Sequence, residues 1–484
     1  MTDEKPEKKD LISIISRFLP SIEKPTYKQS INTRIKWTMF ALIMYFVLSY
    51  ITVYGISPTS YEQFRFFEIV LGSRFGSLMT LGIGPIVTAG IILQLLVGSK
   101  ILNWNTTTPE GRRKFQTWNK FLAITFSFLE AIAYVLAGAL GQIIGGIDIL
   151  IFVIIQLAAG GILVILLDEL VSKWGFGSGV SLFIAAGVGS QILIRALSPI
   201  AATCDVFGSG FGSCIPSAGN PPTGLLWSSI LNMLAGETTN ALVTIGPLIA
   251  TGVVFLLVVY AQSIRVDVPL AFSALRGFGR SWSLKLFYTS NIPVILTAAL
   301  IANVQLMGRI GITPDQLGQS CGVLGCFDQQ GNPVSGLVFY LSAPPSLLTD
   351  IITLNFVPAE FLRAITYLLF LVIGSMIFAI FWVNTAGMDA KSVAGQIEGI
   401  GLQIPGYRRD PRIIESVLNR YIPALAVLGG LSVGLLAGLA DFTGALGTGT
   451  GILLTVMIIY NYYEELSQQN LEEAHPLIRK AFGE

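Results

Sequence analysis

Charged residues are scarce in this chain. They make up 12% of its 484 residues, about half of the roughly 25% found in ordinary soluble domains. Hydrophobic residues, in contrast, make up 52%. The formal net charge is only +1, so the chain lacks the basic field typical of a DNA-binding protein. The composition therefore argues against a soluble domain and predicts a membrane protein without DNA among its partners.

Residues that serve catalysis or metal binding are also few. The single histidine, His475, lies in a polar C-terminal tail, and there are only four cysteines. No HExxH, GxSxG or P-loop motif occurs in the sequence, so no known catalytic chemistry is indicated. We therefore expect that the protein is not an enzyme and that it binds no metal and no cofactor.

Few ionisable groups lie inside the apolar stretches. Only Glu130 stands clearly in the middle of one, whereas Asp148, Asp168, Glu169 and Asp441 lie near the ends. Ionisable groups at membrane depth are costly and usually mark a path for ions or substrates. A secondary transporter driven by protons or Na⁺ would ordinarily contain more of them. The sequence favours a conduit whose cargo supplies its own driving force.

Ten stretches are long and apolar enough to be candidate membrane spans, because a helix needs about 20 apolar residues to cross the hydrocarbon core. They are residues 37–56, 76–98, 121–140, 149–171, 179–197, 241–262, 287–307, 361–383, 421–440 and 443–463. This pattern predicts an all-α membrane protein with ten transmembrane helices.

The positive charges fall on alternate connections between these stretches. Of the 30 Lys and Arg residues, 25 lie in segments that share a side with the N-terminus. Cytoplasmic segments retain positive charge, so we expect both termini in the cytoplasm and the protein in the plasma membrane.

The four cysteines lie in two connections on the charge-poor side. Cys204 and Cys214 share one connection, and Cys321 and Cys326 share another. External cysteine pairs can oxidise, whereas cytosolic thiols stay reduced. Two local disulfides are the favoured interpretation, with free thiols and a metal site as alternatives; CGVLGC has no neighbouring ligand to complete a zinc site.

The spans divide into two halves. Five precede a Gly-, Ser- and Pro-rich connection and five follow it, so the second half would cross the membrane in the opposite sense, as in an inverted repeat. The expected divisions are a cytoplasmic N-terminal amphipathic segment (1–36), a first five-helix half (37–197), an external linker loop (198–240), a second five-helix half (241–463) and a cytoplasmic tail (464–484).

The segment 57–75 lies between the first two spans but is too polar and too short to cross. It could re-enter the external side of the bundle, which is tolerated only where protein or a water-filled cavity surrounds it. A surface loop is the alternative.

Several motifs resemble the SecY family, the central pore subunit of the Sec protein translocon, and in particular its archaeal members. They are TLGIGPIVTAG (80–90), LDELVSKWGFGSGVSLFIAAGV (167–188), SNIPVIL (290–296) and GALGTGTGILLT (444–455). The resemblance covers nearly all of residues 11–484.

The resemblance implies roles for residues that composition and spacing alone would not single out. Its mid-membrane pore ring of aliphatic side chains matches Ile83, Val87, Val180, Ile184, Ile295 and Leu454. The polar cluster of its lateral gate matches Thr88, Glu130 and Asn303. By themselves, the ring residues would be interpreted as ordinary helix packing, and the polar residues as interhelical hydrogen bonding.

The resemblance also implies a plug and a docking surface. The plug would be the segment 57–75, including Tyr61, Phe64, Phe67, Ile69 and Val70. Ribosome docking would involve basic residues of two cytoplasmic loops, among them Arg276, Arg280, Arg408 and Arg409, since such charges can contact RNA phosphates. Charges that only set the topology are the alternative.

We therefore predict a channel that translocates secretory polypeptides and releases membrane helices sideways into lipid. The expected partners are SecE-type and small β-type subunits, the ribosome, nascent signal-bearing polypeptides and membrane lipid. A small-solute secondary transporter is the alternative from another class, and a purely structural membrane scaffold is a third.

Overall fold

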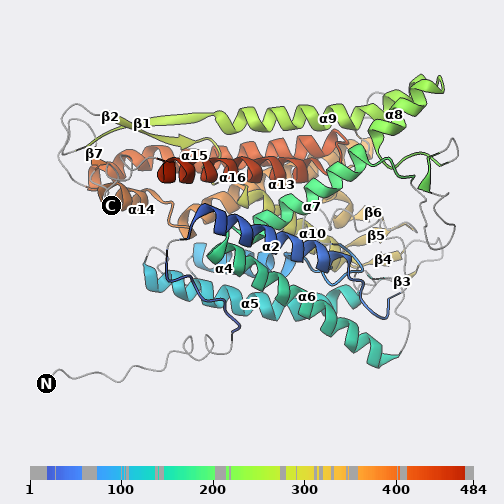
Figure 1. Ribbon diagram of the computed structural model, residues 1–484, viewed down its shortest axis with the longest axis horizontal. Helices are drawn as coiled ribbons and strands as arrows, with labels where there is room; N and C mark the ends of the chain where they lie inside the picture. The colour runs from blue at the N-terminus through green and yellow to red at the C-terminus, as the bar shows by residue number, and fades with distance from the viewer. Residues whose placement is uncertain are drawn as a thin grey trace.

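The computed structural model describes the greater part of the chain, and Figure 1 shows its helices lying side by side along the longest axis. The described residues are 19–27, 29–56, 74–99, 101–102, 104, 108–136, 140, 146–201, 214–216, 220–272, 279–289, 291–309, 313–314, 320–328, 332–344, 347, 358–399, 402–403 and 411–474.

A helix lies at each of the ten predicted spans. These helices are α2 (Ile31–Tyr50), α4 (Gly84–Gly98), α5 (Pro109–Leu136), α6 (Ile147–Trp174), α7 (Gly179–Leu197), α9 (Thr238–Ser263), α10 (Ile292–Gly308), α13 (Pro358–Thr385), α15 (Pro411–Phe442) and α16 (Gly449–Ala474). Within the described residues, six helices are long and apolar enough to cross a membrane. The chain is therefore mostly helical, with at least part of its helices of membrane-spanning length.

The second predicted span begins later than expected. α4 begins at Gly84 rather than at residue 76, because Gly76 and Gly82 adopt positive φ angles of 78° and 52°. Such angles are open to glycine and interrupt a helix. As a result, α4 has only 15 residues, fewer than the roughly 20 of a full crossing.

The linker between the halves is more regular than its composition suggests. It contains a helix, α8 (Leu225–Leu234), that packs along α9. Two shorter helices complete the helical structure: α11 (Leu337–Tyr340) before α13, and α14 (Ala390–Gly399) before α15. Before α2, the irregular residues 20–25 contact the end of α6, since the Trp174 indole N–H donates to the carbonyl of Glu23 at 2.8 Å.

Two small antiparallel sheets lie at opposite ends of the helices (Figure 1). At one end, called the β1 end, strands β1 (Arg265–Phe272), β2 (Gly279–Lys285) and β7 (Leu402–Gln403) pair in the order β2-β1-β7. At the other, called the β3 end, β3 (Thr313–Pro314), β4 (Ser320–Gly322), β5 (Gly325–Phe327) and β6 (Pro333–Gly336) pair in chain order.

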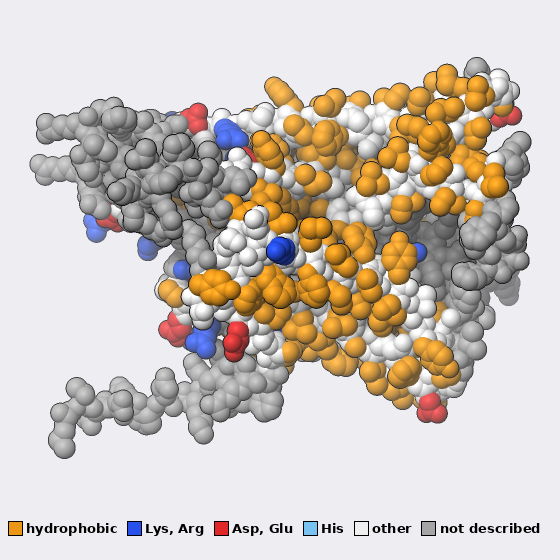
Figure 2. All heavy atoms as spheres, in the orientation of Figure 1, with side chains coloured by type: hydrophobic (Ala, Val, Ile, Leu, Met, Phe, Trp, Pro, Cys, Tyr) orange, Lys and Arg blue, Asp and Glu red, His pale blue; other side chains and the backbone are white. Residues whose placement is uncertain are grey.

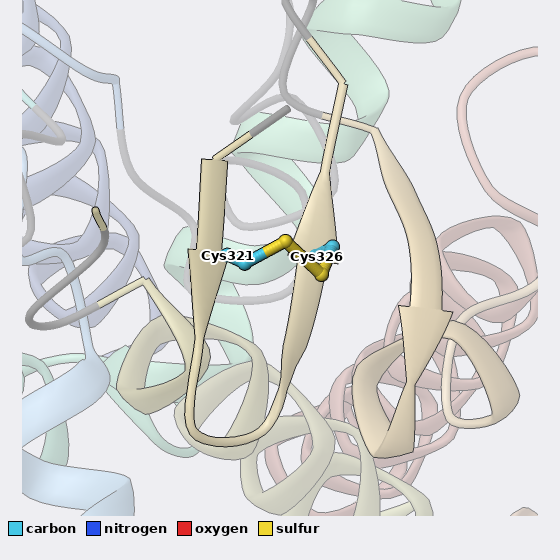
Figure 3. The surroundings of a disulfide bond; sticks show 2 residues. All are labelled: Cys321 and Cys326. Carbon is cyan, nitrogen blue, oxygen red and sulfur yellow. A yellow bond between two sulfur atoms is a disulfide. The ribbon is translucent and has the colours of Figure 1, made fainter. Parts of the chain in front are cut away.

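The sheet at the β3 end contains a disulfide. Cys321 and Cys326 face each other in the β4–β5 register and are bonded, as the sequence predicts (Figure 3). Cys214 is also disulfide-bonded, while Cys204 lies outside the described residues. Beside this sheet, the Arg309 guanidinium lies 4.7 Å from the centre of the Phe327 ring. Burial lowers the pKa of Arg309 to about 10, against the opposing effect of Asp328, so the cation still carries its charge at neutral pH.

The outer surface is largely apolar. Figure 2 shows hydrophobic side chains spread over the middle of the visible face, with charged side chains mostly toward the ends. Leu256 of α9 is 67% exposed, and Ile155 of α6 and Ile373 of α13 are about half exposed. Apolar exposure on this scale is typical of a lipid-facing surface rather than of a soluble monomer.

Candidate functional site

Four helices contribute the six predicted ring residues to one large buried apolar cluster. Ile83 and Val87 come from the start of α4, Val180 and Ile184 from α7, Ile295 from α10 and Leu454 from α16. Five of them belong to one buried cluster of apolar side chains, and the half-buried Val180 packs against it. The site is therefore a continuous apolar contact among helices from both halves of the sequence.

The polar residues predicted for the gate form a hydrogen-bonded chain beside this cluster. The Asn303 side-chain amide donates to the Thr88 hydroxyl at 3.2 Å. That hydroxyl in turn donates to a carboxyl oxygen of Glu130 at 2.7 Å. Glu130 is 8% exposed. The chain links α10 to α4 and α4 to α5, and we call it the polar relay.

A polar contact in an apolar setting holds helices together only while its partners are in place. Interhelical hydrogen bonds in membranes contribute about 0.6 kcal/mol on average, so the polar relay is a weak link compared with close apolar packing. The contact between α4 and α10 therefore consists of hydrogen bonds of modest strength beside an apolar cluster.

Two aspartates that the sequence places near span ends have a definite structural role. Asp168, in the last turns of α6, accepts the backbone N–H of Val180 at 2.9 Å. Asp441, at the end of α15, accepts the backbone N–H of Thr450 at 3.0 Å. Each carboxylate thus satisfies an orphan donor in the first turn of the next helix, where the helix dipole also favours negative charge.

The first cap binds the backbone of a ring residue, Val180, and the second binds Thr450, one helical turn from a ring residue. Ile184 follows Val180 by four residues, and Leu454 follows Thr450 by four. Residues four apart lie on the same helical face. Sequence rules look for a cap directly before a helix, so they miss caps supplied from nine or twelve residues upstream.

The two predicted docking loops meet in the sheet at the β1 end. Strands β1 and β2 belong to the first loop, and β7, from the second loop, pairs with β1. Arg280 lies on β2, opposite Leu270, whereas Arg276, Arg408 and Arg409 lie outside the described residues. Glu464 of α16 binds both Arg265 and Lys285, the paired ends of this hairpin.

The five predicted plug residues, from Tyr61 to Val70, also lie outside the described residues, as does most of the predicted N-terminal amphipathic stretch. The residues that flank the plug segment are described, and they contact each other. The Val53 N–H donates to the carbonyl of Gly76 at 2.9 Å. Residues 53 and 76, which flank the plug segment, are therefore held together.

Comparisons with known proteins identify the family of the chain. The sequence profile of SecY matches residues 77–463, and that of the plug domain of Sec61p matches residues 43–76. The protein translocase subunit SecY of Pyrococcus furiosus is 45% identical, with 98% of this chain and 99% of the relative covered. The SecY subunit of Methanocaldococcus jannaschii is 41% identical over 98% of this chain and 99% of its own length.

Solved structures show the same similarity. One described as a protein-conducting channel superimposes with a TM-score of 0.79 at 41% identity, covering 97% of this chain and 99% of the other. Sec61 in the canine ribosome-channel complex from the endoplasmic reticulum superimposes with a TM-score of 0.76 at 40% identity, with the same coverage. The resemblance inferred from the motifs is thereby confirmed. The chain belongs to the SecY family of multi-pass membrane proteins, which are protein-conducting channels and not enzymes.

Proposed function

We propose that this chain is the pore subunit of a Sec translocon in the plasma membrane, with ten transmembrane helices in two inverted five-helix halves and both termini in the cytoplasm. The observation that carries the proposal is the polar relay beside the apolar cluster, since the two together form a junction that can open and a core that can seal. An ion-coupled transporter is not favoured, because the family match is to protein-conducting channels.

The inverted arrangement draws support from the two aspartate caps. Asp168 joins the fourth predicted span to the fifth, and Asp441 joins the ninth to the tenth. These are equivalent connections in two five-span halves. In both, the second residue of the new helix donates its N–H to the carboxylate.

The six ring residues seal the idle channel in this proposal. Aliphatic side chains exclude water and ions from a narrow passage, yet they can move apart and close around a passing polypeptide. Val180 is half-buried while the other five are buried, so it lies at the edge of the seal. The plug segment 57–75, whose ends are held together at Val53 and Gly76, supplements the seal from one side.

Site-specific crosslinking to a stalled secretory nascent chain tests the ring. A photo-crosslinking residue at Val87 or Ile295 is expected to capture the nascent chain, because both side chains belong to the central cluster. Leu95, on the same helix as Val87 but 38% exposed, is the matched control. Capture from Leu95 alone, or from none of the three, would contradict translocation through the ring.

The polar relay sets how hydrophobic a segment must be to open the gate between α4 and α10. Replacing Thr88 by Val removes both hydrogen bonds of the relay and substitutes an apolar contact that favours the closed junction. We expect Thr88→Val to require more hydrophobic signal sequences for the same translocation. Thr125→Val is the control, since this exposed α5 residue bonds only to its own helix, at Phe121.

The proposed partners follow from the family and from the basic loops at the β1 end. A related solved structure is a channel bound to a ribosome, and the sheet at the β1 end joins the two loops that carry the predicted basic residues. SecE-type and small β-type subunits would complete the complex, and nascent signal-bearing polypeptides would be its substrates. Membrane helices would leave sideways through the gate into lipid.

A further inference from the structure

The helix α8 has its polar and apolar sides reversed relative to a helix of a soluble protein. Ser228 and Ser229 are buried, with exposures of 8% and 5%. Met233 and Leu234, in contrast, are 67% and 80% exposed. Three further apolar side chains, Trp227, Ile230 and Leu231, are each more than 40% exposed. An exposed apolar face of this size on an external helix points to an apolar environment.

The position of α8 is fixed by its neighbours. The stretch before it pairs with the end of α7, since the Gly224 N–H donates to the Ser198 carbonyl at 2.9 Å. A Cβ on Gly224 would lie 2.5 Å from that same carbonyl oxygen, so only glycine permits this approach. The Trp227 indole N–H donates to the carbonyl of Leu197 at 2.9 Å. The exposed face therefore belongs to a docked helix rather than to a loosely attached one.

The exposed face continues the lipid-facing surface on both sides. On α7, Leu193 and Leu197 are 60% and 51% exposed, and on α9, Leu242 and Val243 are 72% and 60% exposed. Figure 2 shows hydrophobic side chains running along the upper edge of the molecule over α9 and α8. The apolar surface of the bundle thus extends over α8 at the β3 end.

The local sequence contains no charge that would hold this surface in water. Residues 206–236 include no Asp, Glu, Lys or Arg, and the first charged residue after α8 is Glu237. Because the polar side of α8 packs against protein, only its apolar side is left to face the surroundings, and exposed apolar side chains bind a helix to the acyl boundary of a bilayer. Indole rings also prefer that level of the bilayer.

We propose that α8 is an interfacial helix whose outer face, formed by Trp227, Ile230, Leu231, Met233 and Leu234, lies against the acyl chains of the outer leaflet. The linker between the two halves is then anchored to the bilayer at its C-terminal part. This inference takes the membrane location from the family and the leaflet from the orientation in the proposed function, but it uses neither the ring nor the gate. A failure of the depth measurement would therefore leave the proposed channel function standing.

Depth measurements with a spin label test it. Met233→Cys receives a nitroxide, and the purified full chain is reconstituted into phosphatidylcholine–phosphatidylglycerol vesicles. Accessibility to apolar oxygen is then compared with accessibility to a water-soluble nickel complex. Two references bracket the result: Leu256→Cys, on the lipid-facing side of α9, and Val323→Cys, which is 99% exposed in the β4–β5 turn. Protein without an introduced cysteine corrects for background labelling.

The oxygen-to-nickel ratio at residue 233 is expected to be several-fold higher than at residue 323 and to approach that at residue 256. A ratio like that of residue 323 would place α8 in water and overturn the proposal. Low accessibility to both reagents would mean that a protein, such as a second copy of the chain, covers the face, and would overturn it equally. Leu234→Cys provides the same measurement if Met233→Cys does not fold.

Discussion

The starts of α7 and α16 differ in their surroundings although they are built in the same way. Each begins with a glycine, and each has its second N–H accepted by an aspartate from the preceding helix. α16 runs antiparallel to α7 beside it, because the Tyr462 hydroxyl, well along α16, donates to the Ser178 carbonyl just before α7. The two helix starts therefore lie at opposite ends of this helix pair.

The surroundings of the two carboxylates are unequal. Asp441 also accepts the hydroxyls of Tyr367 and Thr450, and both of these side chains are only 1% exposed. Asp168 lies beside a turn in which Gly177 and Ser178 are exposed. Both aspartates are themselves half-buried, but the partners of Asp441 are enclosed among α13, α15 and α16, whereas water can reach the turn beside Asp168. The comparison indicates that a helix-capping carboxylate contributes more to the free energy of unfolding where water cannot replace it.

Alanine at the two starting glycines is expected to have the largest effect. A Cβ on Gly449 would lie 2.0 Å from the carbonyl carbon of Ala440, and one on Gly179 would lie 2.5 Å from the Cα of Asp168. Backbone must shift in both cases, and more at Gly449. We expect Gly449→Ala to abolish folded protein and Gly179→Ala to reduce it strongly, as measured by size-exclusion chromatography of a fluorescent fusion.

The matched control is Gly189→Ala, on the same helix as Gly179. A Cβ there meets nothing within 4 Å, and alanine is preferred to glycine in a helix by about 1 kcal/mol. This variant should therefore fold at least as well as the natural chain. Normal folding of Gly449→Ala would show that the close approach of α15 and α16 is not required.

The ring residues next to the two caps should have equivalent effects on sealing. Ile184 and Leu454 belong to the same buried cluster, one from each helix. We expect Ile184→Ser and Leu454→Ser to raise the idle ion conductance of purified channels in planar bilayers by similar factors. The triple change of Ile83, Val87 and Ile184 to Ser should raise it further, because a polar lining retains water.

The same triple change at Ile91, Ile92 and Leu95, farther along α4, is the control for the ring. These positions should affect stability more than conductance. An equal leak from both triple variants would mean that the ring positions are not special. A leak from Ile184→Ser but not from Leu454→Ser would instead break the equivalence of the two halves.

Removing the carboxylates should separate the two caps. In Asp441→Ala, two buried hydroxyls and one N–H lose an acceptor, and each unsatisfied buried donor costs about 1–3 kcal/mol. In Asp168→Ala, water can replace the carboxylate at the exposed turn, so the loss should be about 1 kcal/mol, as for an ordinary helix cap. Thermal unfolding in detergent should show a clearly larger fall in Tm for Asp441→Ala.

Asparagine is the informative conservative change at both positions, since its side-chain oxygen can still accept the helix N–H. Asp168→Asn should restore most of the lost Tm. Asp441→Asn should restore only part, because one amide oxygen would have to replace two carboxylate oxygens that together accept three hydrogen bonds. Equal falls in Tm for the two alanine variants would contradict the role assigned to the surroundings.

The sequence predicted the helices well because their signal is strong. A helix overlaps each of the ten predicted spans, with shifted bounds at several of them. α7 has the predicted bounds, since Gly and Ser precede it and a Ser-Pro pair follows it. The β1–β2 hairpin and α8 were not predicted. Their stability depends on neighbours distant in sequence, such as Glu464 for the hairpin and the end of α7 for α8.

The site was predictable only in part, and for a physical reason. An aliphatic residue in an apolar helix looks the same whether it lines a pore or packs in a core, so Ile184 and Leu454 were recognised only through family motifs. Asp168 and Asp441 were visible as charges near span ends, but their partners Val180 and Thr450 follow only from the three-dimensional turn.

The smallest expected effect concerns the tyrosine that connects the two helix starts. Tyr462→Phe removes one hydrogen bond to the carbonyl of the exposed residue Ser178, where water can take its place, so the loss should be at the lower end of about 0.5–1.5 kcal/mol. Tyr367→Phe removes the same chemical group from the closed surroundings of Asp441. It should therefore lower the Tm more, although each change deletes a single oxygen. If Tyr462→Phe instead had the larger effect, contact between the halves would matter more than enclosure, and the ranking of the two caps would have to be reversed.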